Sequence, residues 1–406
     1  MIEAAVARYA AFLRLPDVTR MLAMAIVARM PIGTVTLALL LHVRAITGSF
    51  AAAGAAVGAY LGASAVTAPF IGRWIDRRGA RSALIAMGIA SPLALLALWA
   101  AEPLRLSAST ILLIAALAGA SAPPITVLTR TMWRHRFSDA DARKTAFALD
   151  SVLVELAFTL GPALIALLLA VGSPTIAFGA AFVFSTLAVP TFLASPALRY
   201  WRHDPHAERH MLGPLTEPLL LAVFATTFLL TCSLGMLEIA YPGFAARAAN
   251  PPLAGVLLAI NSVGSAIGGL IYGGAHFAMP LERQLRRALG LVVVPIAIHA
   301  VITSAVALAI VAFVAGLLIA PTLTMVTLLV SSYAPSRYAT EAFTWSATCI
   351  ISGIGAGNAL GGVLLERFAP AVAFGASACA ALLAATCALT RKVSAPQRHR
   401  PPREPS

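Results

Sequence analysis

The chain has 406 residues, of which 60% are hydrophobic and only 11% are charged, and its mean hydropathy is +0.87. Soluble domains carry about 25% charged residues, so this composition excludes an ordinary soluble protein and predicts an all-α polytopic membrane protein. The net charge of +13 would suit nucleic-acid binding, but the arginines lie in short gaps between apolar segments, where membrane topology explains them. We therefore expect no nucleic-acid partner.

Residues 1–17 form the first predicted unit, an N-terminal surface segment. Ile2, Val6, Tyr9 and Leu13 recur at helical spacing close to two arginines, which predicts a short helix lying on the membrane surface. A frayed cytoplasmic tail is the alternative. The segment lacks a signal-peptide pattern, because its apolar run comes late and no small-residue cleavage site follows.

Long apolar runs recur along the rest of the chain. A helix needs about 20 apolar residues to cross the hydrocarbon core of a bilayer. The sequence predicts twelve such helices, near residues 21–43, 50–72, 82–101, 108–129, 145–171, 175–195, 218–241, 252–275, 288–303, 304–330, 342–365 and 370–390. The ninth and tenth form one stretch that is too long for a single span, and we divide it near Thr303 and Ser304. Pro123, Pro124 and Pro321 are expected to break or bend their helices.

The basic residues between the spans predict the orientation of the chain. If the N-terminus is cytoplasmic, 24 of the 29 Lys and Arg fall in cytoplasmic segments, as the positive-inside rule requires. Both termini are therefore expected in the cytoplasm. The longest polar gap, 196–217, reads as a central cytoplasmic linker between two six-helix bundles, 18–195 and 218–390, and 391–406 form a basic cytoplasmic tail.

The most specific motif is the loop GRWIDRRGAR at residues 72–81, between the second and third spans. Gly72, Asp76, Arg77, Gly79 and Arg81 follow a pattern that resembles the signature loop of the major facilitator superfamily. The resemblance implies two parallel six-helix repeats and secondary transport. The stretches LDSVLVELAFTLGP, LEIAYPGFAARAA and TEAFTW resemble actinobacterial efflux-type members of that family.

The resemblance also implies a latch between the two halves. In the family, the loop aspartate, here Asp76, faces the N-terminal end of the eleventh helix, where a negative charge is favourable. The predicted eleventh span begins near Glu341, within expected reach of Arg77 or Arg81. The corresponding gap of the second half, GGAHFAMPLERQLRR, lacks the Asp-Arg pair, so we expect no equivalent there.

Glycines in two spans repeat every four residues. Such small stripes let helices approach closely in lipid, and ordinary packing is the simpler explanation. Because the second and eleventh helices face each other in the family, a sliding seam between the halves is the alternative. The stripes are Gly54, Gly58 and Gly62, and Gly353, Gly357 and Gly361. Gly161 and Pro162 resemble part of the antiporter signature of the fifth helix.

Ionisable side chains inside the spans are the candidate coupling residues, because each costs about 2.5–3.5 kcal/mol on insertion scales unless it faces a partner or a cavity. Arg29 in the first span and Glu155 in the fifth are expected at similar depth, so they could pair. Asp150 points elsewhere around the fifth helix. We expect it to pair with Arg130 or with the signature loop.

Glu155 is predicted to face the cavity as a proton carrier or cation binder. A permanent structural pair with the arginine of the first span is the alternative. Glu238 follows two threonines and Gly235 along the seventh span, which lines the cavity in the family. It is a second candidate for the cavity, unless it lies at the outer interface.

These patterns favour a proton-coupled exporter of small apolar or weakly cationic compounds in a bacterial inner membrane. An uptake symporter or facilitator on the same fold is the first alternative, and a receptor or scaffold without transport is another. We expect no enzyme, cofactor or metal site, because the four cysteines lack paired spacing and no nucleotide-binding loop is present. The expected partners are a small-molecule substrate, protons and lipid, with the protein as a monomer.

Overall fold

The computed structural model describes residues 9–48, 50–101, 104, 106–200, 213–250 and 252–389, which fold into two helical bundles. The N-terminal bundle contains α2 (Pro16–Thr47), α3 (Phe50–Arg78), α4 (Ala80–Trp99), α5 (Ala108–Ala120), α6 (Ile125–Arg136), α7 (Ala140–Val171) and α8 (Pro174–Ala194). The C-terminal bundle contains α9 (Gly213–Thr216), α10 (Pro218–Arg247), α11 (Pro252–Gly274), α12 (Leu281–His299), α13 (Ala305–Tyr333), α14 (Ala339–Arg367) and α15 (Pro370–Leu389). The short helices η1 (Pro196–Tyr200) and η2 (Ser336–Tyr338) lie in the gaps.

Within the described residues, eleven helices are long and apolar enough to cross a membrane, so the chain is a multi-pass membrane protein. The predicted ninth span corresponds to α12, which packs beside α13 and α15 but opens with the charged turn LERQLRR and does not meet that criterion. Of the N-terminal surface segment, residues 9–13 are helical, and Ile2 and Val6 lie outside the described residues.

Helix boundaries follow local sequence signals. The predicted fourth span is split into α5 and α6 at Pro123 and Pro124, which cannot continue a helix. Pro321, in contrast, lies inside an uninterrupted α13. The predicted division of the long apolar stretch coincides with the gap between His299 and Ala305.

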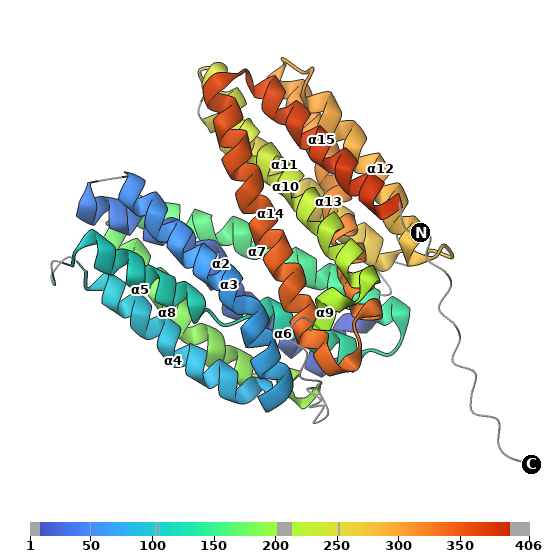
Figure 1. Cartoon of the computed structure of the whole chain (residues 1–406), viewed down its shortest axis with the longest axis horizontal. Coiled ribbons are helices and arrows are strands. Elements are labelled where there is room, and N and C mark those ends of the chain that lie inside the picture. Colours follow the sequence, from blue (N-terminus) through green and yellow to red (C-terminus); the bar gives the residue numbers. More distant parts are fainter. Residues whose placement is uncertain are drawn as a thin grey trace, which may run out of the picture.

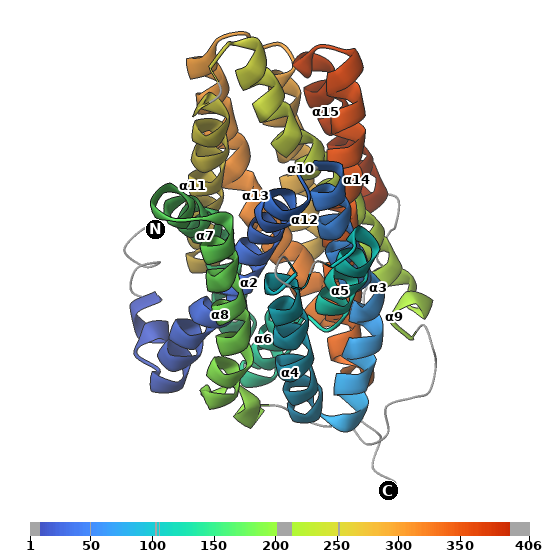
Figure 2. The ribbon, with the colours of Figure 1, turned by 90° about the vertical axis from the view of Figure 1, so that its left-hand side faces the viewer.

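The two bundles meet at one end of the molecule and separate toward the other. We call the meeting end the basic end, defined by the arginine-bearing segments 73–81, 130–144 and 276–287. Figure 1 shows the bundles converging toward the lower right and diverging toward the upper left, and Figure 2 shows the C-terminal bundle rising behind the N-terminal one. Contacts between the bundles run mainly along α3 and α14 and along α7 and α11. These two helix pairs position the candidate site.

Gly161 lies at a close approach of α2 and α7. A Cβ atom added at Gly161 would lie 2.7 Å from the Cα atom of Gly33, too close for any side chain. We expect Gly161→Val to lower stability by about 1–3 kcal/mol, because overpacking must push the two helices apart. Thermal unfolding in detergent measures the loss.

Gly355→Val is the matched control for this prediction. A Cβ atom at Gly355 would meet nothing within 4 Å, although Gly355 is also a glycine inside a long helix. Its replacement should leave the unfolding temperature close to that of the unmodified protein. Equal losses from both variants would show that the close approach at Gly161 has no special role.

Candidate functional site

Asp76 lies at the end of α3 and caps the first turn of α14. Its Oδ1 accepts a hydrogen bond from the backbone N–H of Thr340 at 3.3 Å, and its Oδ2 accepts one from that of Glu341 at 2.9 Å. The first N–H groups of a helix have no partner within it and carry the positive end of the helix dipole. A carboxylate from the N-terminal bundle therefore completes a helix of the C-terminal bundle, as the family resemblance implied.

The neighbouring ion pair to Glu341 comes from Arg73, at 3.1 Å between Nη2 and Oε1. The expectation that Arg77 or Arg81 forms this pair is therefore corrected. Arg73 precedes Asp76 by three residues and shares its face of α3, whereas Arg77 is turned by about 100° and is exposed, as is Arg81. Because i and i+3 positions are neighbours on a helix, the sequence already held the signal for Arg73.

The two glycines of the signature loop have different structural roles. Gly79 has φ 85° and forms the turn between α3 and α4, a conformation that favours glycine. Gly72 lies inside α3 and not in the turn. A Cβ atom there would lie 3.1 Å from the Cα atom of Glu341, so this glycine permits the close approach of α3 to α14.

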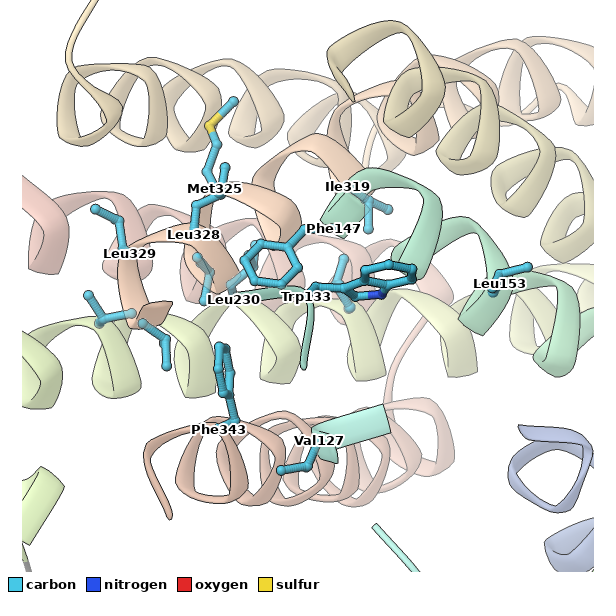
Figure 3. Close-up of a cluster of buried hydrophobic side chains, with 14 of the residues drawn as sticks. Val127, Trp133, Phe147, Leu153, Leu230, Ile319, Met325, Leu328, Leu329 and Phe343 are labelled. Atoms are coloured by element: carbon cyan, nitrogen blue, oxygen red, sulfur yellow. The ribbon is translucent and has the colours of Figure 1, made fainter. Parts of the chain in front are cut away.

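Further contacts close the basic end around this cap. Arg134 of α6 donates to the carbonyl oxygen of Ala334, the C-cap residue of α13, at 2.5 Å. Phe147 of α7 packs edge to face on Phe343 of α14, with 6.2 Å between ring centroids. Figure 3 shows these two rings and the buried Trp133 within one apolar cluster that draws on both bundles. The basic end is thus sealed by an ion pair, hydrogen bonds and a hydrophobic layer.

The glycine stripes do not form a sliding seam between α3 and α14, which was the alternative to ordinary packing. A Cβ atom at Gly54, Gly58 or Gly62 would meet nothing within 4 Å. The α14 stripe, Gly353, Gly357 and Gly361, packs against α10 of its own bundle. The contact between α3 and α14 extends toward the opposite end as far as Thr348, whose hydroxyl donates to the carbonyl oxygen of Ala65 at 3.2 Å. The stripes lie beyond this point, where the bundles have separated.

Arg29, Asp150 and Arg130 form one buried cluster. Arg29 and Asp150 are fully buried and form an ion pair, and Arg130 Nε lies 3.1 Å from Asp150 Oδ2. The pair of Asp150 with Arg130 matches expectation, but Arg29 contacts Asp150 and not Glu155. The physical reason is angular, because Asp150 and Glu155 lie about 140° apart around α7 and only Asp150 faces α2 and α6. The cluster carries a net charge of +1.

Glu155 faces the C-terminal bundle. Its Oε1 accepts a hydrogen bond from the hydroxyl of Ser265 on α11, at 3.0 Å. Within the described residues Glu155 takes part in no ion pair, so a neutral hydroxyl is the partner of its carboxylate. Glu155 therefore differs from Asp150, although both lie on one helix.

Glu238 does not share the environment of the residues predicted to accompany it. Thr227 and Thr231 are buried and donate to backbone carbonyl groups of their own helix, and Thr231 also reaches the carbonyl oxygen of Cys349 on α14. Gly235 packs against α14 as well. Glu238 lies within about 20° of Thr227 and Thr231 around α10, but it is further along the helix, near the exposed margin, and is itself exposed. The predicted polar face is therefore a packing face with one accessible carboxylate at its edge.

Comparisons with known proteins agree with this architecture. The sequence model of the Major Facilitator Superfamily matches residues 21–222. A bacterial homologue of the iron transporter ferroportin, in an outward-facing state, has TM-score 0.77 and 16% sequence identity, over 91% of this chain and 98% of that chain. The human organic anion transporter MFSD10 (TETRAN) has TM-score 0.70 and 15% identity, over 92% and 99%. No curated protein matches the chain.

The proton:xylose symporter XylE is a third similar structure, with TM-score 0.70 and 12% identity, over 91% of this chain and 94% of that chain. These three proteins carry different substrates, so the likeness concerns architecture. It extends over more than nine-tenths of the chain in each case. The chain therefore has the fold of the major facilitator superfamily transporters, and its N-terminal half matches the sequence pattern of that family.

Proposed function

We propose that the protein is a major facilitator superfamily transporter that exports small apolar or weakly cationic compounds in exchange for protons. It works as a monomer in a bacterial inner membrane, with both termini and the basic end in the cytoplasm. The excess of arginine at this end and the efflux-type sequence stretches support this orientation and direction.

The observation that carries the proposal is the one-sided closure of the bundles. Asp76 and Arg73 join α3 to α14 at the basic end, while the opposite part of α3 has open space around its glycines. Alternating access requires two bundles that rock about a central site. With the basic end cytoplasmic, this arrangement is the outward-facing state, the state of the similar ferroportin homologue.

Glu155 is the residue that we assign to proton coupling. It lies on α7 of one bundle and contacts α11 of the other, so its surroundings must change when the bundles rock. Its partner is a neutral hydroxyl, whereas Asp150 forms ion pairs with two arginines. Glu238 adds a carboxylate that suits a weakly cationic substrate.

We expect Glu155→Gln to abolish substrate-driven proton release, because an amide cannot carry a proton across the membrane. The measurement uses proteoliposomes with a preformed pH gradient, to which apolar cations, neutral antibiotics and metabolites are added in turn. Glu217→Gln, which removes a carboxylate at the N-cap of α10, is the matched control and should keep full coupling. Coupling that persists in Glu155→Gln but not in Glu238→Gln would transfer the role to Glu238.

The same assay separates export from uptake on this fold. The likeness to a proton:xylose symporter favours keeping uptake as the second candidate function. In an exchanger, substrate and protons move in opposite directions, whereas in a symporter an added substrate carries protons with it. Solute that equilibrates without any proton movement identifies an uncoupled facilitator, and then Glu155 has no coupling role.

A further inference from the structure

Lys144 joins the second pair of helices at the basic end. It lies in the first turns of α7, is 6% exposed, and donates from Nζ to the carbonyl oxygen of Ala275 at 2.8 Å. The same Nζ lies 4.0 Å from the ring centroid of Tyr272 and 4.3 Å from that of Phe277. One cation from the N-terminal bundle is thus enclosed by a carbonyl group and two rings at the end of α11.

The backbone around Lys144 shows what this contact completes. Helix α11 ends at Gly274, and the last carbonyl groups of a helix have no partner within it and carry the negative end of its dipole. Thr145, next to Lys144, donates from its hydroxyl to the carbonyl oxygen of Gly273 at 3.0 Å. Two side chains of α7 therefore satisfy the C-terminal end of α11.

The other polar groups near this contact have partners of their own. Asp141 lies one turn earlier on α7 and contacts His276 at 2.8 Å, at the exposed margin of the interface. One turn before the end of α11, the hydroxyl of Tyr9 donates to the carbonyl oxygen of Leu270 at 2.7 Å. Lys144 is the buried cation among these groups, and it is one of only two lysines in the chain.

The contact of Lys144 exists only while the basic end is closed. If α11 moves away from α7, the ammonium group loses the carbonyl oxygen and both rings together, and water replaces them. A cation–π contact and a hydrogen bond from a charged donor both stabilise an ammonium group that is removed from water. Because these contacts are present in the closed state and lost in the open state, they shift the equilibrium toward the closed state.

We propose that Lys144 is a positioning residue of the transport cycle that holds the basic end closed at α11, as Asp76 does at α14. The two contacts are related by opposite charge. A carboxylate satisfies the N–H groups that begin α14, and an ammonium satisfies the carbonyl groups that end α11. The gap that follows α11 lacks the Asp-Arg pair, and at this helix pair the charged group comes instead from Lys144 of α7.

The test measures the closed and open populations directly, without substrate or protons. Spin labels at Ser138→Cys and Ala278→Cys, both exposed, flank the contact at the basic end, in a background without Cys232, Cys349, Cys379 and Cys387. A second pair, Ala108→Cys and Val256→Cys, reports on the opposite end. Pulsed electron paramagnetic resonance gives the distance distributions of both pairs.

Lys144→Met should raise the ratio of open to closed basic end by about 10-fold, with the first label distance longer and the second shorter. Lys144→Arg keeps the cation and should stay near the unmodified ratio. Arg143→Met removes the adjacent positive charge and is the matched control, expected to change nothing. A ratio in Lys144→Met equal to that in Arg143→Met would overturn the proposal.

The inference rests on the proposed transport cycle, but its failure is separable from failure of that function. If Lys144→Met shifts the populations while no compound moves in the proton assay, the closure role of Lys144 stands and the assignment as a proton-coupled exporter falls. If the populations stay fixed while transport is intact, the exporter stands and the role of Lys144 falls.

Discussion

Asp76→Ala should open the basic end more strongly than any other single change in the signature loop. The variant removes two hydrogen bonds from a charged acceptor and leaves the first turn of α14 without its cap. We expect closure to weaken by about 2–3 kcal/mol, or roughly 30- to 150-fold in the ratio of closed to open states. Asp76→Asn should have an intermediate effect, because its amide oxygen still accepts a hydrogen bond but carries no charge.

Hydrogen exchange is the measurement suited to this prediction. The N–H groups of Thr340 and Glu341 are protected by Asp76 only while the bundles are in contact, so their exchange should accelerate in Asp76→Ala. Asp139→Ala is the matched control. Asp139 accepts from the N–H of Ala142 at 2.7 Å and caps its own helix, α7. Its loss should affect the start of α7 and leave α14 unchanged.

Unchanged exchange at the start of α14 in Asp76→Ala would mean that the contact contributes nothing to closure. Faster exchange there in Asp139→Ala, to the same extent, would mean that any loss at the basic end loosens α14. Either result would contradict a specific role for Asp76. The comparison is sharp because both aspartates cap a helix, and only one of them does so across the two bundles.

The arrangement of helices could be predicted from the sequence because it depends on local signals. Apolar length defines the spans, paired prolines divide α5 from α6, and Ser304 precedes the first residue of α13. Apolar length alone does not identify α12 as a span, because its first turns are charged. This helix packs with its neighbours although only its later turns are apolar.

Partners of individual side chains could be predicted only in part, because they depend on the rotation of each helix about its axis. The register of α7 separates Asp150 from Glu155, but nothing in the sequence of α2 shows which of them Arg29 faces. The role of Arg73 could have been predicted from the sequence, since Arg73 shares a helix face with Asp76. The role of Lys144 could not be predicted, because that would require knowing where α11 ends and which helix lies beside that end.

The glycine stripes illustrate a different limit. Their spacing correctly indicates close packing for α14, but the packing partner is α10, in the same bundle. The α3 stripe lies where the bundles have separated. A sequence pattern is constant, whereas the contacts between bundles belong to one state of the cycle, so a seam between them cannot be derived from the pattern alone.

Asp150→Asn is expected to cause the largest loss of stability among substitutions inside the bundles. Arg29 is fully buried, and its Nε and Nη1 have no hydrogen-bond partner within the described residues, so Asp150 is the group that compensates its charge. Removal of one partner from a buried ion pair costs about 3–5 kcal/mol, because the remaining charge stays buried. Thermal unfolding of the purified protein in detergent measures this cost.

Arg130→Met provides the comparison, since it leaves the pair of Arg29 with Asp150 intact and removes a partly accessible cation. Its cost should be clearly smaller. Combining Asp150→Asn with Arg29→Met removes both buried charges and should recover most of the lost stability. If the double variant is no more stable than Asp150→Asn alone, the uncompensated charge of Arg29 is not the cause.

Glu155→Gln completes the argument, because within the described residues its carboxylate is hydrogen-bonded by the Ser265 hydroxyl alone, and an amide can keep that hydrogen bond. We expect its unfolding temperature to stay close to that of the unmodified protein while proton coupling is lost. Asp150→Asn should show the reverse order of effects, with instability as the primary defect. Two acids five residues apart on α7 would then be separated by experiment into one that holds the bundle together and one that serves the transport cycle.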